Sequence, residues 1–198
     1  YRTNAPAPIA PGNHTTSVAY SVSTSPGAYT VTVGGGGGGA TDTKGADGSD
    51  SVFGTITSDG GGGGGQGSVP SPQNEGAPGG SGGGGGSTAG TTEIEPGGSS
   101  TAVTTPSPWP GPATQGFAGG QGQHVNGSWA AGGGGGGAGE VGHAAQHPNP
   151  GTSSDGGDGL SNLIAGPTNS GVGVINPASP GRWFAGGGAG IHHAGTNP

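Results

Sequence analysis

The sequence predicts a mostly irregular fold, a bundle of polyproline-II-like polyglycine helices preceded by a short β-hairpin. The chain has 56 glycines and 18 prolines among its 198 residues. Only 25% of the residues are hydrophobic, about half of the roughly 45–50% that is usual in globular domains. The chain therefore lacks the side chains for an ordinary core of helices or alternating strands. Its glycines also gather in unbroken runs, which disfavour both α-helix and β-strand.

Two alternating runs near the N-terminus predict the β-hairpin. Apolar residues recur there at every second position: Val18, Tyr20 and Val22 in residues 15–23, and Tyr29, Val31 and Val33 in residues 28–33. Pro26 and Gly27 lie between the runs and are typical of a turn. We therefore divide the chain into an N-terminal arm with a short β element (residues 1–33) and a glycine-rich bundle with surface loops (residues 34–198).

Three unbroken runs of six glycines predict the bundle, from Gly34 to Gly39, from Gly60 to Gly65 and from Gly132 to Gly137. Polyproline-II geometry has three residues per turn and no internal hydrogen bonds, so buried N–H and C=O groups need partners elsewhere. Helices without Cβ atoms approach closely enough to bond to each other. We expect the three runs to lie adjacent, with all-glycine helices inside and Ala- or Ser-containing helices outside.

Aromatic residues repeatedly occur a few positions before a glycine run: Phe53, Trp129, Trp183 and Phe184. We expect these rings to cover the ends of the bundle and to be its most buried large side chains. A flexible linker is the alternative interpretation, because Gly- and Ser-rich sequence usually behaves as random coil. A plain linker has no need of hexaglycine blocks with aromatic residues before them.

Three segments resemble the glycine-rich domain of bacteriophage tail-fibre and adhesin proteins: AYTVTVGGGGGG (residues 28–39), SVFGTITSDGGGGGG (residues 51–65) and GLSNLI (residues 159–164). The resemblance extends over roughly residues 28–190. It implies a polyglycine-II sandwich with variable distal loops, and receptor binding or a structural role in a virion. The Pro- and Thr-rich residues 91–114 depart from that pattern. Glycine-rich antifreeze proteins of springtails are also similar, but their regular triplet and disulfides are missing here.

The charge and residue types exclude several classes of function. The chain has three Lys and Arg residues and a net charge of −7, so it offers no basic patch for nucleic acid. It has no cysteine and no apolar stretch long enough to span a membrane. The motifs of a nucleophile elbow or a phosphate-binding loop are absent. We expect no catalytic residues, no enzyme activity and no cofactor.

The candidate metal ligands favour solvated loops over metal sites. Asp42, Asp47 and Asp50 offer carboxylates in a glycine-rich stretch, yet their spacing differs from that of a calcium loop. Residues 156–159 (GGDG) begin like a calcium-binding nonapeptide repeat but occur once. The histidines, including the helically spaced His143 and His147 and the pair at 192–193, lie among Gly, Ala and Pro. We therefore predict no metal site.

The loops are where partner recognition is expected, because the glycine runs offer no side chains that a partner can distinguish. Trp109 stands between Pro108 and Pro110, and an amphipathic ring held in this way is a suitable anchor for a sugar or a protein. Packing of Trp109 on the bundle is the alternative. His124 is a second candidate. Asn13 and Asn126 match the pattern of N-glycosylation sites.

These observations predict a virion appendage protein of the tail-fibre or fibre-tip adhesin type, located on the virion surface or outside the cell. Its expected partner is a host cell-surface glycan or protein, within a homo-oligomeric assembly. The alternative is a self-assembling extracellular filament subunit whose partner is a copy of itself. In that case residues 1–33 add a β-strand to the next protomer. The chain starts at Tyr1 and has no methionine, as expected of a processed product or a fragment.

Overall fold

The computed structural model describes residues 21–25, 27–67, 73–87, 93–102, 114–125, 129–146, 154–162, 174–175 and 182–194. No helix occurs in these ranges, and the strands are two to four residues long. The strands are β1 (Val31–Thr32), β2 (Ser51–Phe53), β3 (Ile56–Ser58), β4 (Glu93–Glu95), β5 (Gly122–Val125), β6 (Trp129–Ala131), β7 (Leu160–Asn162), β8 (Val174–Ile175), β9 (Arg182–Phe184) and β10 (His192–Ala194). The prediction of a mostly irregular chain with short antiparallel strands is confirmed.

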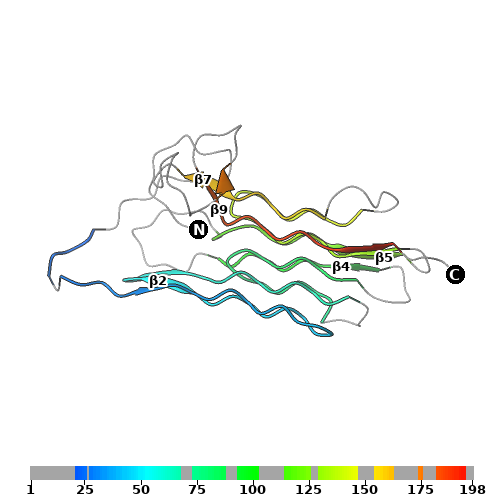
Figure 1. Ribbon diagram of the computed structural model, residues 1–198, viewed down its shortest axis with the longest axis horizontal. Coiled ribbons are helices and arrows are strands. Elements are labelled where there is room, and N and C mark those ends of the chain that lie inside the picture. The colour runs from blue at the N-terminus through cyan, green and yellow to red at the C-terminus, as the bar shows by residue number, and fades with distance from the viewer. Residues whose placement is uncertain are drawn as a thin grey trace.

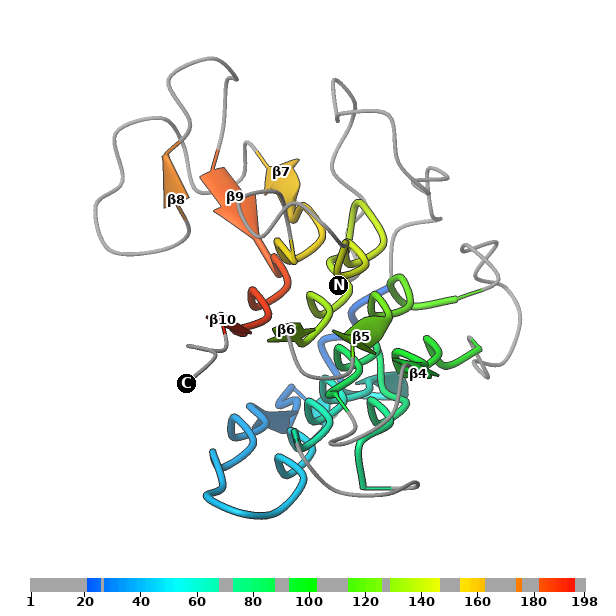
Figure 2. The same ribbon diagram turned by 90° about the vertical axis from the view of Figure 1, so that its right-hand side faces the viewer.

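Extended segments run side by side along the long axis of the molecule, and the strands lie toward their ends (Figure 1). Seen along that axis, the segments are narrow coils (Figure 2). The strands form three antiparallel sheets with the orders β1-β2-β3, β10-β6-β5-β4 and β7-β9-β8. The four-stranded sheet lies toward one end of the molecule, which we call the four-strand end, and the other two sheets lie toward the opposite end.

Backbone hydrogen bonds join the glycine segments to one another. The N–H of Gly62 donates to the carbonyl of Ser81, and three residues later the N–H of Gly65 donates to the carbonyl of Gly84, both at 2.9 Å. Other pairs of segments repeat this spacing of three residues. Consecutive segments reverse direction, and we call this set of hydrogen-bonded, side-by-side extended segments the bundle.

Glycine is required in these segments by close approach of the backbones. A Cβ added at Gly63 would lie 1.9 Å from the carbonyl oxygen of Gly45, and one at Gly62 would lie 2.0 Å from that of Ala77. Backbone freedom is not the reason, because among the described glycines only Gly27 and Gly54 have positive φ. The missing Cβ therefore sets the distance between segments.

The β element differs from the expected hairpin. β1 pairs with β2, through Val31 opposite Phe53, and β2 forms a hairpin with β3. Its two-residue turn has φ 59° at Gly54, as a type II′ turn requires at its first position. The ring of Tyr29 stacks on Phe53 with 5.6 Å between centroids. Residues 21–25 contain no strand, and the rest of the expected partner run, residues 15–20, lies outside the described residues.

The arrangement of the hexaglycine runs also corrects the sequence-based expectation. Backbone hydrogen bonds do not join residues 34–39, 60–65 and 132–137 to each other; each of these three described runs bonds to other segments. Residues 34–39 are mostly exposed and bond to residues 44–50, so an all-glycine segment lies at the edge of the bundle. All faces of a glycine run are chemically alike, and the sequence therefore does not specify which segments become neighbours.

The buried hydrophobic residues of the described chain are four alanines and one leucine, namely Ala77, Ala131, Ala138, Ala145 and Leu160, and Asn74 is fully buried. Phe53, Trp183 and Phe184 are only half-buried, so the expectation that they are the most buried large side chains is wrong. Backbones in hydrogen-bonding contact leave no room for a ring between them. The side chain of Trp129 is outside the described part.

Candidate recognition surfaces

The described strands carry side chains of varied chemistry and lie toward the two ends of the bundle (Figure 1). Successive glycine segments reverse direction, so each described segment runs from one end to the other. The flanks consist of glycine backbone together with side chains on the outer segments, among them the exposed Asp47, Val141 and Asp155. At the ends, side chains from several strands lie next to one another, as in the four-stranded sheet, and a partner finds distinguishing groups there.

At the four-strand end, His124 lies in β5, a central strand, and not in a loop as predicted. His124 is directly opposite Glu93 of β4 on one side and Ala130 of β6 on the other. Directly opposite residues of antiparallel strands share a face of the sheet, so this face carries an imidazole and a carboxylate beside a small side chain. Glu93 is exposed and His124 is half-buried. On the other face, Ile94 is 59% exposed.

The loop that contains Trp109 is attached at the opposite end. Trp109 itself lies outside the described residues, but the two stems of its loop, Ala102 and Thr114, form an antiparallel bridge. The chain leads away from β4 to Ala102 and returns from Thr114 to β5, with antiparallel bonds between the two segments. His124 therefore lies toward the four-strand end, while the stems of the loop that contains Trp109 are attached at the opposite end.

Asp59 ties the stems of that loop to the bundle. Its Oδ2 accepts a hydrogen bond of 2.7 Å from the Thr101 hydroxyl, and its N–H donates to Oε1 of Gln115 at 2.9 Å. Both partners lie next to the stem bridge, and Gln115 is buried. No pattern in the sequence indicates this cluster, because Thr101 and Gln115 are 42 and 56 residues away from Asp59 along the chain.

The carboxylates considered as calcium ligands have structural roles. Oδ1 of Asp47 accepts the N–H of Gly63 at 2.8 Å, and Oδ1 of Asp50 accepts the N–H of Gly60 at 2.9 Å. These side chains occupy the place of a neighbouring carbonyl along residues 44–50, instead of lying in a solvated turn. Asp42 is exposed in the preceding connection, at φ 61°.

The remaining predicted sites give no cluster of ligands. Nε2 of His143 lies 3.4 Å from Oε1 of Glu140, and each of the two side chains is about half-exposed. Within the described ranges, no three His, Asp or Glu residues are grouped to hold a metal ion. Asn13, Asn126 and His147 lie outside the described residues, and the side chains of residues 192–193 are not described.

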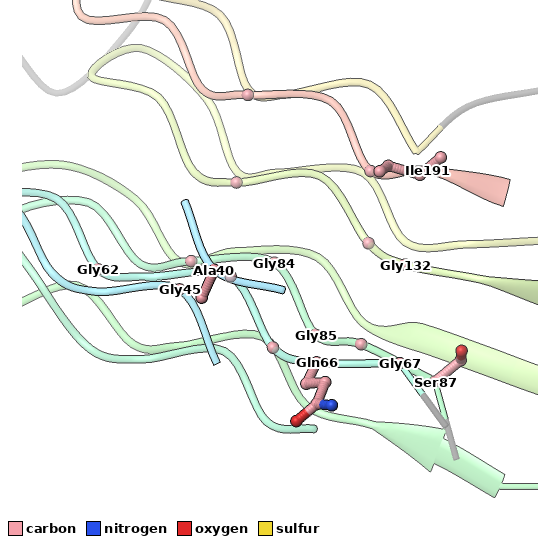
Figure 3. A pocket seen from close by; sticks show the side chains of 18 of the residues that line it. Ala40, Gly45, Gly62, Gln66, Gly67, Gly84, Gly85, Ser87, Gly132 and Ile191 are labelled. Carbon is pink, nitrogen blue, oxygen red and sulfur yellow. The ribbon is translucent and has the colours of Figure 1, made fainter. Parts of the chain in front are cut away.

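Two grooves run between glycine segments, and sequence reasoning missed both. The larger has a volume of about 720 Å³ and lies on a flank of the bundle (Figure 3). The smaller has a volume of about 510 Å³ and is lined by residues 34–39, residues 60–64 and part of residues 45–49. Both are lined mainly by glycine backbone, which provides hydrogen-bonding groups, and the larger is lined also by side chains that include Asp42, Gln66 and Ile191.

The chain matches no family model, no curated protein sequence and no solved structure. In the part of the chain that the structure describes, no helix is long and apolar enough to cross a membrane. The function is therefore argued from the geometry of the bundle and its ends.

Proposed function

We propose that the glycine segments are polyglycine-II helices and that their bundle is the rigid body of a structural, adhesive appendage protein. The spacing of three residues between successive inter-segment bonds equals the three residues per turn of this helix. The same period appears in the space around the glycines, since Gly61 and Gly64 have room for a Cβ while the glycines between them have none.

The position of the strands, with their varied side chains, toward the ends of a body held by backbone bonds is the observation that supports attachment as the function. A bundle held by backbone bonds keeps its shape whatever side chains its ends carry, as loops on rigid scaffolds do in general. The ends then vary to suit a receptor. The chain accordingly acts without catalysis, on a virion surface or outside the cell, as a tail-fibre or fibre-tip adhesin that binds a host cell-surface glycan or protein.

Two places on the ends are candidates for receptor contact. The face of the four-stranded sheet that carries Glu93 and His124 offers polar groups of the kind that sugar hydroxyls bind, with the exposed Ile94 on the same edge strand as Glu93. The loop with Trp109 at the opposite end offers an aromatic anchor. We expect a single receptor contact to use one of them, because the stems of the Trp109 loop are attached at the end opposite His124.

Binding of the fluorescently labelled chain to a panel of bacterial cells and to a glycan array tests this function. We expect His124→Ala or Trp109→Ala, but not both, to lower the affinity about tenfold or more, as for a modest hot spot. Thr55→Ala, an exposed change in the turn of the β2–β3 hairpin, is the matched control. Failure of the wild-type chain to bind any cell or glycan would contradict the proposal.

One observation favours the alternative of a self-assembling extracellular filament. β1 is an edge strand of its sheet, and Val31 and Val33 are 61% and 82% exposed. Exposed apolar edges of this kind accept an added strand. Electron microscopy of the purified chain distinguishes the functions, since the alternative predicts long polymers that Val31→Lys shortens or abolishes.

A further inference from the structure

The larger groove has the form of a trough along one flank of the bundle. We call it the trough and define it by residues 62–67 on one side, residues 188–191 on the other, and residues 83–87 with glycines 132, 133 and 135 at its base. Figure 3 shows Gly62, Gln66, Gly84, Gly132 and Ile191 around it. Residues 40–43 and Gly45 also line it. The trough therefore touches four glycine segments.

The segment at residues 132–138 shows what the trough is missing. Three residues per turn direct N–H groups in three directions and C=O groups in three, so one segment can bond to as many as six neighbours. Residues 132–138 bond to five segments, which are residues 82–85, 117–120, 140–143, 157 and 185–191. The trough lies on the side that remains.

The segment at residues 81–86 leads to the same place. It bonds to five segments as well, which are residues 62–65, 74–77, 98, 117–120 and 133–136. Its open side lies between residues 62–65 and 133–136, and that side is again the trough. One empty position in the bundle is thus the missing neighbour of two interior segments.

Backbone groups along the trough have no partner within the described part of the chain. The N–H groups of Gly64, Gly84 and Gly188 donate no hydrogen bond there, and the carbonyls of Gly62 and Gly65 accept none. At the end of the same wall, Gln66 has a buried Oε1 without a partner. An additional segment of the same geometry would satisfy these donors and acceptors, as an added strand does at a sheet edge.

The chain itself carries a segment suited to this place. Residues 34–39 are uncharged and bond, among the described residues, only to residues 44–51. Of the six glycines, only Gly34 and Gly37 are required by close contact inside the chain; at the other four, an added Cβ meets nothing within 4 Å. Glycine loses more conformational freedom on folding than any other residue, so four glycines without an internal reason indicate a contact outside the chain.

We propose that residues 34–39 of one copy dock in the trough of a second copy. A segment with one neighbour in its own chain has faces left for the four segments of the trough. The two surfaces are different parts of the molecule, so the contact is heterologous and each copy offers both halves. Such contacts continue into rings or open filaments. The inference is independent of receptor binding, which is located at the ends.

Sedimentation of the purified chain over a range of concentrations tests the contact. Gly188→Val fills the trough and Gly36→Val enlarges the docking segment; both positions are exposed, and neither Cβ meets an atom within 4 Å inside the chain. Each variant is therefore expected to fold, with a wild-type melting temperature as the check. Ser99→Val, on an exposed position that lines neither groove, is the matched control.

We expect the wild type and Ser99→Val to form oligomers that grow with concentration. Gly188→Val or Gly36→Val alone should raise the dissociation constant about tenfold or more, because forcing a side chain into a close-packed contact is unfavourable. An equimolar mixture of the two variants should form dimers and nothing larger, since one intact trough and one intact docking segment remain. A monomeric wild type, or variants that associate like the wild type, would overturn the proposal.

Discussion

Alanine substitutions made one at a time in residues 60–65 should raise the free energy of unfolding at some positions and lower it at others, although all six residues are glycine. At Gly62 and Gly63 the added Cβ would lie 2.0 and 1.9 Å from carbonyl oxygens, whereas at Gly61 and Gly64 the nearest atoms are 4.0 and 3.9 Å away. The first pair must push a neighbouring segment away. Alanine at the second pair of positions only reduces the conformational entropy of the unfolded chain.

The two effects differ enough to be measured by thermal and denaturant unfolding. Overpacking costs about 1–3 kcal/mol, and the displaced segment weakens a backbone bond worth about 0.5–1.5 kcal/mol. Gly62→Ala and Gly63→Ala should therefore lower the free energy of unfolding by about 2–4 kcal/mol. For a chain of this length that lowers the melting temperature by roughly 5–15 °C. Gly61→Ala and Gly64→Ala should raise the free energy of unfolding by about 0.4–1 kcal/mol. Equal effects at all four positions would refute the reasoning.

Two further changes test individual features of the bundle. Ala185 has φ 57°, a conformation that costs a residue with a Cβ about 1–2 kcal/mol. Ala185→Gly should therefore raise the free energy of unfolding by about 0.5–1 kcal/mol. Ala189→Gly is the control and should lower the free energy of unfolding, because Ala189 does not have a positive φ. Asp47→Ala removes the acceptor of the Gly63 N–H and should lower the free energy of unfolding by about 1–2 kcal/mol. Asp155→Ala removes the same charge at an exposed position and should change it little; equal losses for the two aspartates would show that the Asp47 bond contributes nothing.

The sequence predicted the class of the fold because composition decides it. Few apolar residues and long glycine runs exclude a conventional core, and close approach of backbones is what remains. The strand at residues 31–32 was also predicted, from its alternation. Its partner was not, because alternation indicates which face a residue occupies and not which strand lies beside it.

Neighbours within the bundle could not be predicted, for a related physical reason. A hexaglycine run presents the same atoms on every side, so nothing in residues 34–39 or 132–137 indicates that one lies at the edge and the other inside. One signal was missed: in residues 45–50, Gly45 and Gly48 are three residues apart, and so are Asp47 and Asp50. That period indicates a segment with one glycine face and side chains elsewhere, as the structure shows for both carboxylates.

Amide hydrogen exchange of residues 60–65, measured by NMR on the monomeric chain, tests most directly the claim that backbone bonds between glycine segments hold the bundle together. The N–H groups of Gly60, Gly62, Gly63 and Gly65 donate to neighbouring segments. Those of residues 61 and 64 donate no hydrogen bond in the described part of the chain. The account predicts slow exchange at the four bonded amides and fast exchange at residues 61 and 64, a pattern with a period of three. Fast exchange at all six amides would contradict it.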